Sequence, residues 1–224
     1  GVLPPSTQSA AARAFADDPG LGPVATGTEA IYAAMATGFV SDSGVPAIDY
    51  FISSTLLEPT NADPHYSEKL VQLSHPPVYY YAPEAPKARR RDFGLDDETH
   101  LYGCLQSIFK IHPEFDAIIL GILQRDSRAI VLLLQGGTTE QTRRLARRLN
   151  HPRVRFAQPL DLPQFLALQT CCDVMLDPIY FCGGNTAYEA LALGVPMVTM
   201  PTAYHKGRFT HAHYRSIGLL DCIA

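Results

Sequence analysis

From Thr99 to the end of the chain, short apolar strands alternate with helices. The apolar runs at 129–134 (AIVLLL) and 174–176 (VML) lack polar alternation, which is typical of strands buried on both faces. Strands of this kind that alternate with helices pack as a parallel sheet covered by helices on both sides. We therefore expect an α/β fold with a doubly wound parallel sheet.

The same pattern gives the expected elements. Strands are expected at 101–106, 129–134, 154–156, 174–176 and 196–200, and helices at 113–123, 139–149, 162–171, 188–193 and 207–217. Upstream, the sequence predicts a strand at 45–53, a helix start within 63–73, a short strand at 78–81 and a linker at 83–91. Ligands in such sheets bind outside the carboxyl ends of the strands, so candidate site residues are sought there.

Composition excludes several classes of protein. A chain of 224 residues with 46% hydrophobic residues is a globular domain or parts of two, and is not disordered. The net charge of −4 argues against a nucleic-acid or membrane-surface partner. No apolar run reaches the roughly 18 residues of a membrane span, and the basic cluster at 87–91 is interpreted as a solvated linker.

Cysteine and histidine patterns indicate no metal site. The five cysteines show no metal-ligand spacing, and we interpret them as reduced core thiols of a cytoplasmic protein. They are Cys104, Cys171, Cys172, Cys182 and Cys222. His211 and His213 lie two apart on an expected helix, so they do not share a face and are interpreted as partly exposed helix residues.

A glycine-containing loop between the strand at 174–176 and the next helix is the strongest candidate for an anion site. Gly183 and Gly184 would let the backbone approach a phosphate closely, and Asn185 or Thr186 would cap the helix. The helix start would then present free N–H groups and a positive dipole end. Glu189, one turn further, would reach a ribose hydroxyl. The alternative, an ordinary capped βα loop, stays open on this stretch alone.

A second group of candidates follows the strand at 101–106. Lys110 could meet a diphosphate as a point charge, since a helix start disfavours a merely solvated lysine. Gln106 and Ser107 on the same turn could hydrogen-bond phosphate or sugar, with simple turn chemistry as the alternative.

Three further residues are candidates for donor binding. Phe165 could stack on a flat base, although core packing is the commoner role of phenylalanine. The loop ending at Leu160 could offer backbone groups to a base edge. Arg208, at another helix start, is a second possible phosphate cation.

Several motifs resemble the catalytic region of the O-GlcNAc transferase family, especially its bacterial SPINDLY-like members. The C-terminal half of that region is matched by FKIHPEFDAIILGIL at 109–123, by the stretch from RVRF to VTMP at 153–201, and by GRFTHAHYRSIGLLDCIA at 207–224. VPAIDYFISS at 45–54 and HYSEKLVQL at 65–73 resemble the end of the family's N-terminal lobe.

The resemblance implies a two-lobed GT-B glycosyltransferase that transfers N-acetylglucosamine from UDP-GlcNAc to Ser or Thr of proteins, with inversion and without a metal or other cofactor. We expect residues 1–90 to be part of the N-terminal lobe and a linker, with 1–35 unassigned. Residues 91–224 would form the Rossmann-like lobe that binds the donor. The partners would be a nucleotide sugar and an acceptor protein.

The resemblance also implies roles for individual residues. Lys110 matches the lysine that neutralises the donor diphosphate and assists its departure. Asn185 and Thr186 match the positions that hold the phosphates, and Glu189 matches the acidic residue on the ribose. Leu160 and Phe165 fall at positions that flank the base.

Two departures from the family keep alternatives open. Gly184-Asn185-Thr186 replaces a His-Thr-Thr run of the animal enzymes. The chain also lacks tetratricopeptide repeats and most of the N-terminal lobe, so we expect a fragment or a truncated gene product. The alternatives are fucose transfer from GDP-fucose, glucose transfer to Asn, nucleotide binding without catalysis, and a structural α/β domain with a degenerate site.

Overall fold

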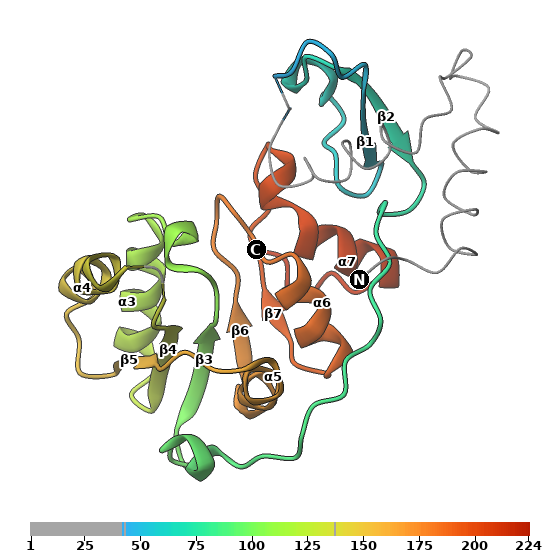
Figure 1. Ribbon diagram of the computed structural model, residues 1–224. Helices are drawn as coiled ribbons and strands as arrows, with labels where there is room; N and C mark the ends of the chain where they lie inside the picture. Colours follow the sequence, from blue (N-terminus) through green and yellow to red (C-terminus); the bar gives the residue numbers. More distant parts are fainter. Residues whose placement is uncertain (1–41, 43, 137) are drawn as a thin grey trace.

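The computed structural model describes residues 42, 44–136 and 138–224, and the unassigned residues 1–35 lie outside this range. Its centre is a five-stranded sheet with all neighbouring strands parallel, in the order β5–β4–β3–β6–β7 (Figure 1). The strands are β3 (His100–Cys104), β4 (Ala129–Leu134), β5 (Val154–Ala157), β6 (Val174–Leu176) and β7 (Met197–Val198). The predicted parallel α/β sheet is confirmed.

Helices cover both faces of this sheet because its strands are apolar on both sides. The helices are α3 (Phe115–Arg125), α4 (Thr139–Arg148), α5 (Leu162–Cys171), α6 (Asn185–Ala192) and α7 (Phe209–Ile217). Along β4, Val131 and Leu133 pack in one core cluster with residues of α3 and α4. Ile130 and Leu132 point the other way, into a second cluster with residues of α5 and α6.

The strand order places a topological switch at β3. The chain moves outward from β3 to β4 and β5, and then returns to add β6 on the opposite side of β3. The connections that leave β3 and β6 therefore diverge to opposite faces of the sheet. A crevice opens between diverging connections at the carboxyl ends of parallel strands. The residues that follow Cys104 and Leu176 lie at this crevice.

The expected helix start within 63–73 is wrong. Only a single 3-10 turn, η1 (Asp63–His65), forms there, and the chain continues as strand β2 (Lys69–Leu73). β2 pairs in parallel with β1 (Tyr50–Ser54), which lies within and just beyond the predicted strand at 45–53. The ladder to β1 decides the conformation, because β-branched and long apolar residues adapt to a strand when a partner is available.

The segment that connects β2 to β3 has no strand at 78–81, so that expectation is also wrong. Residues 74–89 form an extended connection, here called the connecting segment, which runs from the β1–β2 pair down one side of the molecule (Figure 1). It ends at the 3-10 turn η2 (Arg90–Phe93). Arg90 pairs with Asp173 at 2.7 Å and donates to the Cys171 carbonyl at 2.9 Å. Part of the basic cluster predicted to be solvated is therefore anchored.

The turn that follows β1 packs against the helix α7, which lies next to the β1–β2 pair in Figure 1. Leu57 clusters with Phe209 and Ala212 of α7, and Arg208 donates to the Leu57 carbonyl. Arg215 reaches the Thr55 carbonyl at 3.2 Å. These contacts join the two sheets, and the predicted division of the chain at residue 90 stays a prediction.

All five cysteines are free thiols, and all but Cys222 are buried, as expected of core thiols. Within the residues that the structure describes, no helix has the length and apolar character needed to cross a bilayer.

Candidate functional site

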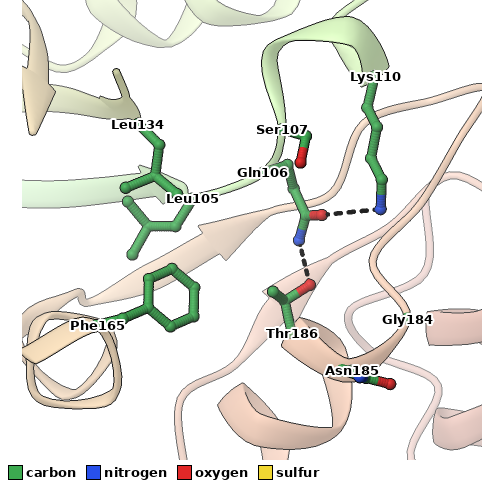
Figure 2. A pocket seen from close by; sticks show the side chains of 9 residues that line it. All are labelled: Leu105, Gln106, Ser107, Lys110, Leu134, Phe165, Gly184, Asn185 and Thr186. Atoms are coloured by element: carbon green, nitrogen blue, oxygen red, sulfur yellow. Dashed lines mark hydrogen bonds between the residues drawn. The ribbon is translucent and has the colours of Figure 1, made fainter. Parts of the chain in front are cut away.

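A hollow of about 280 Å³ lies at the carboxyl ends of β3 and β6, where the strand order predicts a ligand site. Figure 2 shows an apolar side, formed by Leu105, Leu134 and Phe165, and a polar side around Gln106. The remaining lining residues are Ser107, Lys110, Gly184, Asn185 and Thr186. The structure thus brings together seven of the residues predicted from the sequence.

Lys110 is held on the polar side by three neighbours. It is the last residue of the 3-10 turn η3 (Ile108–Lys110), which follows β3 directly. Its Nζ donates to Gln106 Oε1 at 3.2 Å and to the Cys182 carbonyl at 3.0 Å. The same ammonium lies 4.7 Å from the centre of the Phe181 ring, a cation–π distance. These contacts direct a positive charge towards the glycine loop.

The Lys110 ammonium is partly buried and therefore partly dehydrated. Burial lowers its pKa, and the negative charges or dipoles of Cys182, Asp177 and Cys104 act in the opposite direction. A lysine whose solvation is reduced in this way gains most from an anionic ligand, because the ligand replaces the lost water. The site therefore favours an anionic ligand.

Gln106 connects Lys110 to the first turn of α6. Its Nε2 donates to Thr186 Oγ1, and its Oε1 accepts from Lys110, so the three side chains form one hydrogen-bonded chain (Figure 2). Gln106 is only 2% exposed, which fixes this arrangement from within the protein. Gly183 fits beside it because a Cβ there would come within 2.9 Å of Thr186 Oγ1. The need for glycine at 183 is thus one of close approach.

The predicted capping of α6 by Asn185 or Thr186 is wrong. The residue at the cap position is Gly184, with no side-chain cap bond, and Asn185 is the first helical residue. The Thr186 hydroxyl is engaged by Gln106 instead of by the helix backbone. No side chain caps the start of α6, and its first residues Asn185 and Thr186 line the hollow. The hollow therefore borders a helix start, where an anion is favoured.

Asp177 organises the loop between β6 and α6, a role that the sequence analysis did not assign. Its Oδ1 accepts from the Gly183 N–H at 2.7 Å, and its Oδ2 accepts from Thr199 Oγ1 at 2.8 Å. The carboxylate is 4% exposed, and burial raises its pKa to about 6 despite these hydrogen bonds. An acid directly after a buried strand was the available signal. The Asp177 carboxylate ties the glycine loop to Thr199, which directly follows β7.

Glu189 lies one helical turn behind the lining residue Asn185 and does not itself line the hollow. Its carboxylate is 5% exposed and accepts from Tyr80 at 2.6 Å and from Gln169 at 3.2 Å. Tyr80 belongs to the connecting segment, and nothing in the sequence pattern assigned it to the site. The ribose contact expected of Glu189 stays a prediction.

Three other candidates lie away from the lining. Leu160 packs at the edge of the core cluster that contains α5 and α6. Gly183 is buried behind Thr186. Arg208 donates to the carbonyls of Leu57 and Thr202, so its guanidinium is used to join the β1–β2 pair to the loop before α7. The structure does not bring Arg208 to the hollow.

Of the two histidines of α7, His211 is partly exposed as expected, and His213 is less exposed than expected. His213 is 5% exposed and lies under the Tyr188 ring at 3.7 Å, and burial lowers its pKa to about 4. The interpretation of His213 as a partly exposed helix residue is therefore wrong. Among the described residues, no group of three or more His, Cys, Asp or Glu side chains is arranged to hold a metal ion.

Known relatives share this part of the chain. The chain is 26% identical over 179 residues to the probable UDP-N-acetylglucosamine–peptide N-acetylglucosaminyltransferase SEC of Arabidopsis thaliana. The aligned part covers 73% of this chain and 18% of the relative. The chain is 28% identical over 196 residues to the like-named SPINDLY of Solanum lycopersicum, with 83% and 20% covered. The chain thus spans about a fifth of the length of these curated relatives.

A solved structure and a family model agree with these relatives. A mutant O-GlcNAc transferase of Thermobaculum terrenum superposes with a TM-score of 0.71 at 28% identity, over 83% of this chain and 36% of the other. This likeness confirms the predicted GT-B glycosyltransferase fold. The model described as glycosyl transferase family 41 matches residues 82–224, which include every residue that lines the hollow. The chain belongs to glycosyl transferase family 41.

Proposed function

We propose that this chain is the donor-binding half of a protein O-glycosyltransferase that moves N-acetylglucosamine from UDP-GlcNAc to Ser or Thr of an acceptor protein. The observation that carries the proposal is the hydrogen-bonded chain Lys110–Gln106–Thr186, which places a partly buried cation beside the uncapped start of α6. A diphosphate fits between a cation and a helix start, and the apolar wall beside it fits a nucleobase.

The chemistry requires charge stabilisation on the leaving group. Inverting transfer forms a bond from the acceptor oxygen to the sugar C1 while the bond from C1 to the diphosphate breaks. The electron pair leaves with UDP, and the proton of the acceptor hydroxyl passes to a base or to solvent. Lys110 and the N–H groups of α6 would stabilise this developing charge without a metal ion. Phe165, on the opposite side of the hollow, would pack against the base.

The relatives favour the uridine donor over the alternatives. Both SEC and SPINDLY are named as UDP-N-acetylglucosamine transferases, and the Thermobaculum protein as an O-GlcNAc transferase, so their names do not support GDP-fucose. Acceptor proteins, a cytoplasmic setting and a bacterial, repeat-bearing parent protein stay predictions from the sequence. Nucleotide binding without turnover, glucose transfer to Asn and a structural domain with a degenerate site stay as the alternatives.

Calorimetric titration of the 224-residue chain tests the proposal. We expect UDP to bind in the presence of EDTA, and to bind more tightly than UMP or GDP. Replacing Lys110 by Ala should cost about 2 kcal/mol of UDP affinity, roughly thirtyfold, and little UMP affinity, because the ammonium meets the second phosphate. Lys87→Ala is the matched control, since Lys87 is an exposed lysine of the connecting segment.

Three results would contradict the proposal. UDP binding that requires a divalent metal ion would rule out the metal-independent mechanism. Stronger binding of GDP than of UDP would move the donor to a guanosine nucleotide. Equal losses in Lys110→Ala and Lys87→Ala would show that the ammonium of Lys110 does not meet the diphosphate.

A further inference from the structure

Tyr80 joins the connecting segment to the helix α6 through two contacts. Its hydroxyl donates to Glu189 Oε1 at 2.6 Å, although the two residues lie 109 positions apart in the sequence. Its ring stacks on the Tyr188 ring, with centroids 5.7 Å apart and planes 12° from parallel. Tyr188 in turn packs on His213 of α7. A stacked ring and a short hydrogen bond together fix the direction of the phenol O–H.

Glu189 is held from two sides by this arrangement. Tyr80 occupies one lone pair of Oε1, and Gln169 Nε2 donates to Oε2 at 3.2 Å. Gln169 is 0% exposed and cannot move freely. Each carboxylate oxygen offers a second acceptor position. The two donors therefore set the plane of the carboxylate and leave one acceptor position on each oxygen.

The geometry of the helices places this carboxylate beside the hollow. Phe165 of α5 and Asn185 of α6 both line the hollow. Gln169 and Glu189 each lie four residues further along the same helices, which puts them one turn deeper on the same faces. A ligand that fills the hollow and reaches one turn deeper would meet the oriented carboxylate.

Tyr80 remains a hydrogen-bond donor over the whole neutral pH range. Burial, and then the adjacent Glu189 carboxylate, raise the pKa of Tyr80 to about 12. Its neighbours Tyr79 and Tyr81 are exposed by 67% and 62% and contact each other. Of these three tyrosines, Tyr80 is the one bonded to Glu189.

We propose that Tyr80 is a positioning residue of the nucleotide site, which orients Glu189 so that its open acceptor positions receive the two ribose hydroxyls of the donor. This inference rests on the proposed function. It means that the connecting segment, which leads from the β1–β2 pair to the central sheet, contributes to ribose recognition. Without the phenol O–H, the carboxylate would keep only the longer hydrogen bond from Gln169 and would lose its fixed plane.

Titration with two nucleotides separates positioning from packing. UDP and 2′,3′-dideoxy-UDP are titrated into the unaltered chain, Tyr80→Phe, Glu189→Gln, the double variant and the control Tyr79→Phe. We expect Tyr80→Phe, which keeps the ring stack, to weaken UDP binding about tenfold and to leave dideoxy-UDP binding unchanged. In the Glu189→Gln background, Tyr80→Phe should cause no further loss, because the tyrosine acts through that carboxylate. Tyr79→Phe should bind both nucleotides as the unaltered chain does.

The inference and the proposed function fail in different ways. Equal losses of UDP and dideoxy-UDP affinity in Tyr80→Phe would make Tyr80 a packing residue and overturn the inference alone. Tighter UDP binding in Tyr80→Phe would show that the phenol competes with ribose, and would also overturn it. Equal affinity of the unaltered chain for UDP and dideoxy-UDP would show that the ribose hydroxyls contribute nothing to binding, and would overturn the inference. If the unaltered chain binds no UDP, both the proposed function and the inference are overturned.

Discussion

At the scale of single residues, the site depends on two groups of opposite charge, the partly buried Lys110 and the buried Asp177. Burial lowers the pKa of Lys110 and raises the pKa of Asp177, and the attraction between the two charges opposes both changes. The Asp177 carboxylate accepts hydrogen bonds from Gly183 and Thr199, and the Thr210 side chain also hydrogen-bonds to it. Its charge therefore supports the loop at a cost in solvation.

This cost predicts a pH-dependent stability. The pKa of Asp177 changes from 3.8 to about 6 on folding, so the native state binds this proton more tightly than the unfolded state does. The resulting stabilisation is fully present below about pH 4 and is lost as the pH rises through 6, a change of about 3 kcal/mol. Asp177→Asn cannot titrate. The unfolding free energy of the unaltered chain, relative to this variant, should therefore fall between pH 4 and pH 7.

Denaturant unfolding at several pH values measures this difference. Asp221→Asn is the control, since Asp221 is an exposed carboxylate near the end of the chain. Its stability profile should run parallel to that of the unaltered chain. A parallel profile for Asp177→Asn as well would show that burial does not perturb the Asp177 carboxyl.

At the scale of elements, the turn from β6 into α6 requires a residue without a side chain at 183. A methyl group there would lie 2.9 Å from Thr186 Oγ1 and 3.0 Å from Gln106 Nε2. Gly183→Ala should therefore lower the unfolding free energy by about 1–3 kcal/mol, because the two side chains must separate. It should also weaken UDP binding, since those side chains form the polar side of the hollow.

Gly136→Ala provides the matched control. Gly136 follows β4, and a methyl group there would meet no atom within 4 Å. We expect a change of no more than about 0.5 kcal/mol in unfolding free energy and unchanged UDP affinity. Unfolding and titration of both variants side by side give the comparison. Equal behaviour of the two alanine variants would refute the close-approach argument for Gly183.

Elements with a clear local apolar pattern could be predicted from the sequence. Elements whose conformation depends on a distant partner in the sequence could not. The apolar run 129–134 became β4 with the predicted bounds, and α5 also formed at 162–171 as predicted. By contrast, residues 69–73 form a strand because β1 lies beside them. Within the described part of the chain, residues 78–81 pair with no strand, and the Tyr80 ring stacks on Tyr188 of α6 instead. No periodicity in a single sequence encodes such pairings.

The same distinction applies within the site. Lys110, Gln106 and Thr186 were predictable because each follows or begins an element at the carboxyl edge of a parallel sheet. Arg208 also stands at a helix start, yet its guanidinium donates to the Leu57 carbonyl in the turn that follows β1. A position at the end of an element was therefore a sound guide to which residues lie near the site. It did not predict where a long side chain such as that of Arg208 points, because tertiary contacts decide that.

At the scale of the whole molecule, the β1–β2 pair is fastened to the central sheet by arginines that precede or lie on α7. Arg208 is partly buried and bonds to the carbonyls of Leu57 and Thr202, whereas Arg215 is exposed and reaches the Thr55 carbonyl at 3.2 Å. Leu57 itself is 0% exposed. The loss of a donor to a buried carbonyl costs more than the loss of a donor at the surface, where water replaces it.

Arg208→Ala should therefore lower the unfolding free energy by about 1–3 kcal/mol, while Arg215→Ala should change it by less than about 1 kcal/mol. Since Arg208 lies outside the hollow, UDP affinity should be the same in both variants as in the unaltered chain. Denaturant unfolding and calorimetric titration on the same preparations measure the two quantities. If Arg208→Ala instead lost UDP affinity to the extent expected of Lys110→Ala, with stability unchanged, Arg208 would be a phosphate cation, as first expected from its place at a helix start. The apolar contacts of the turn after β1, among them that of Leu57 with Phe209, would then account for most of the stability of this junction.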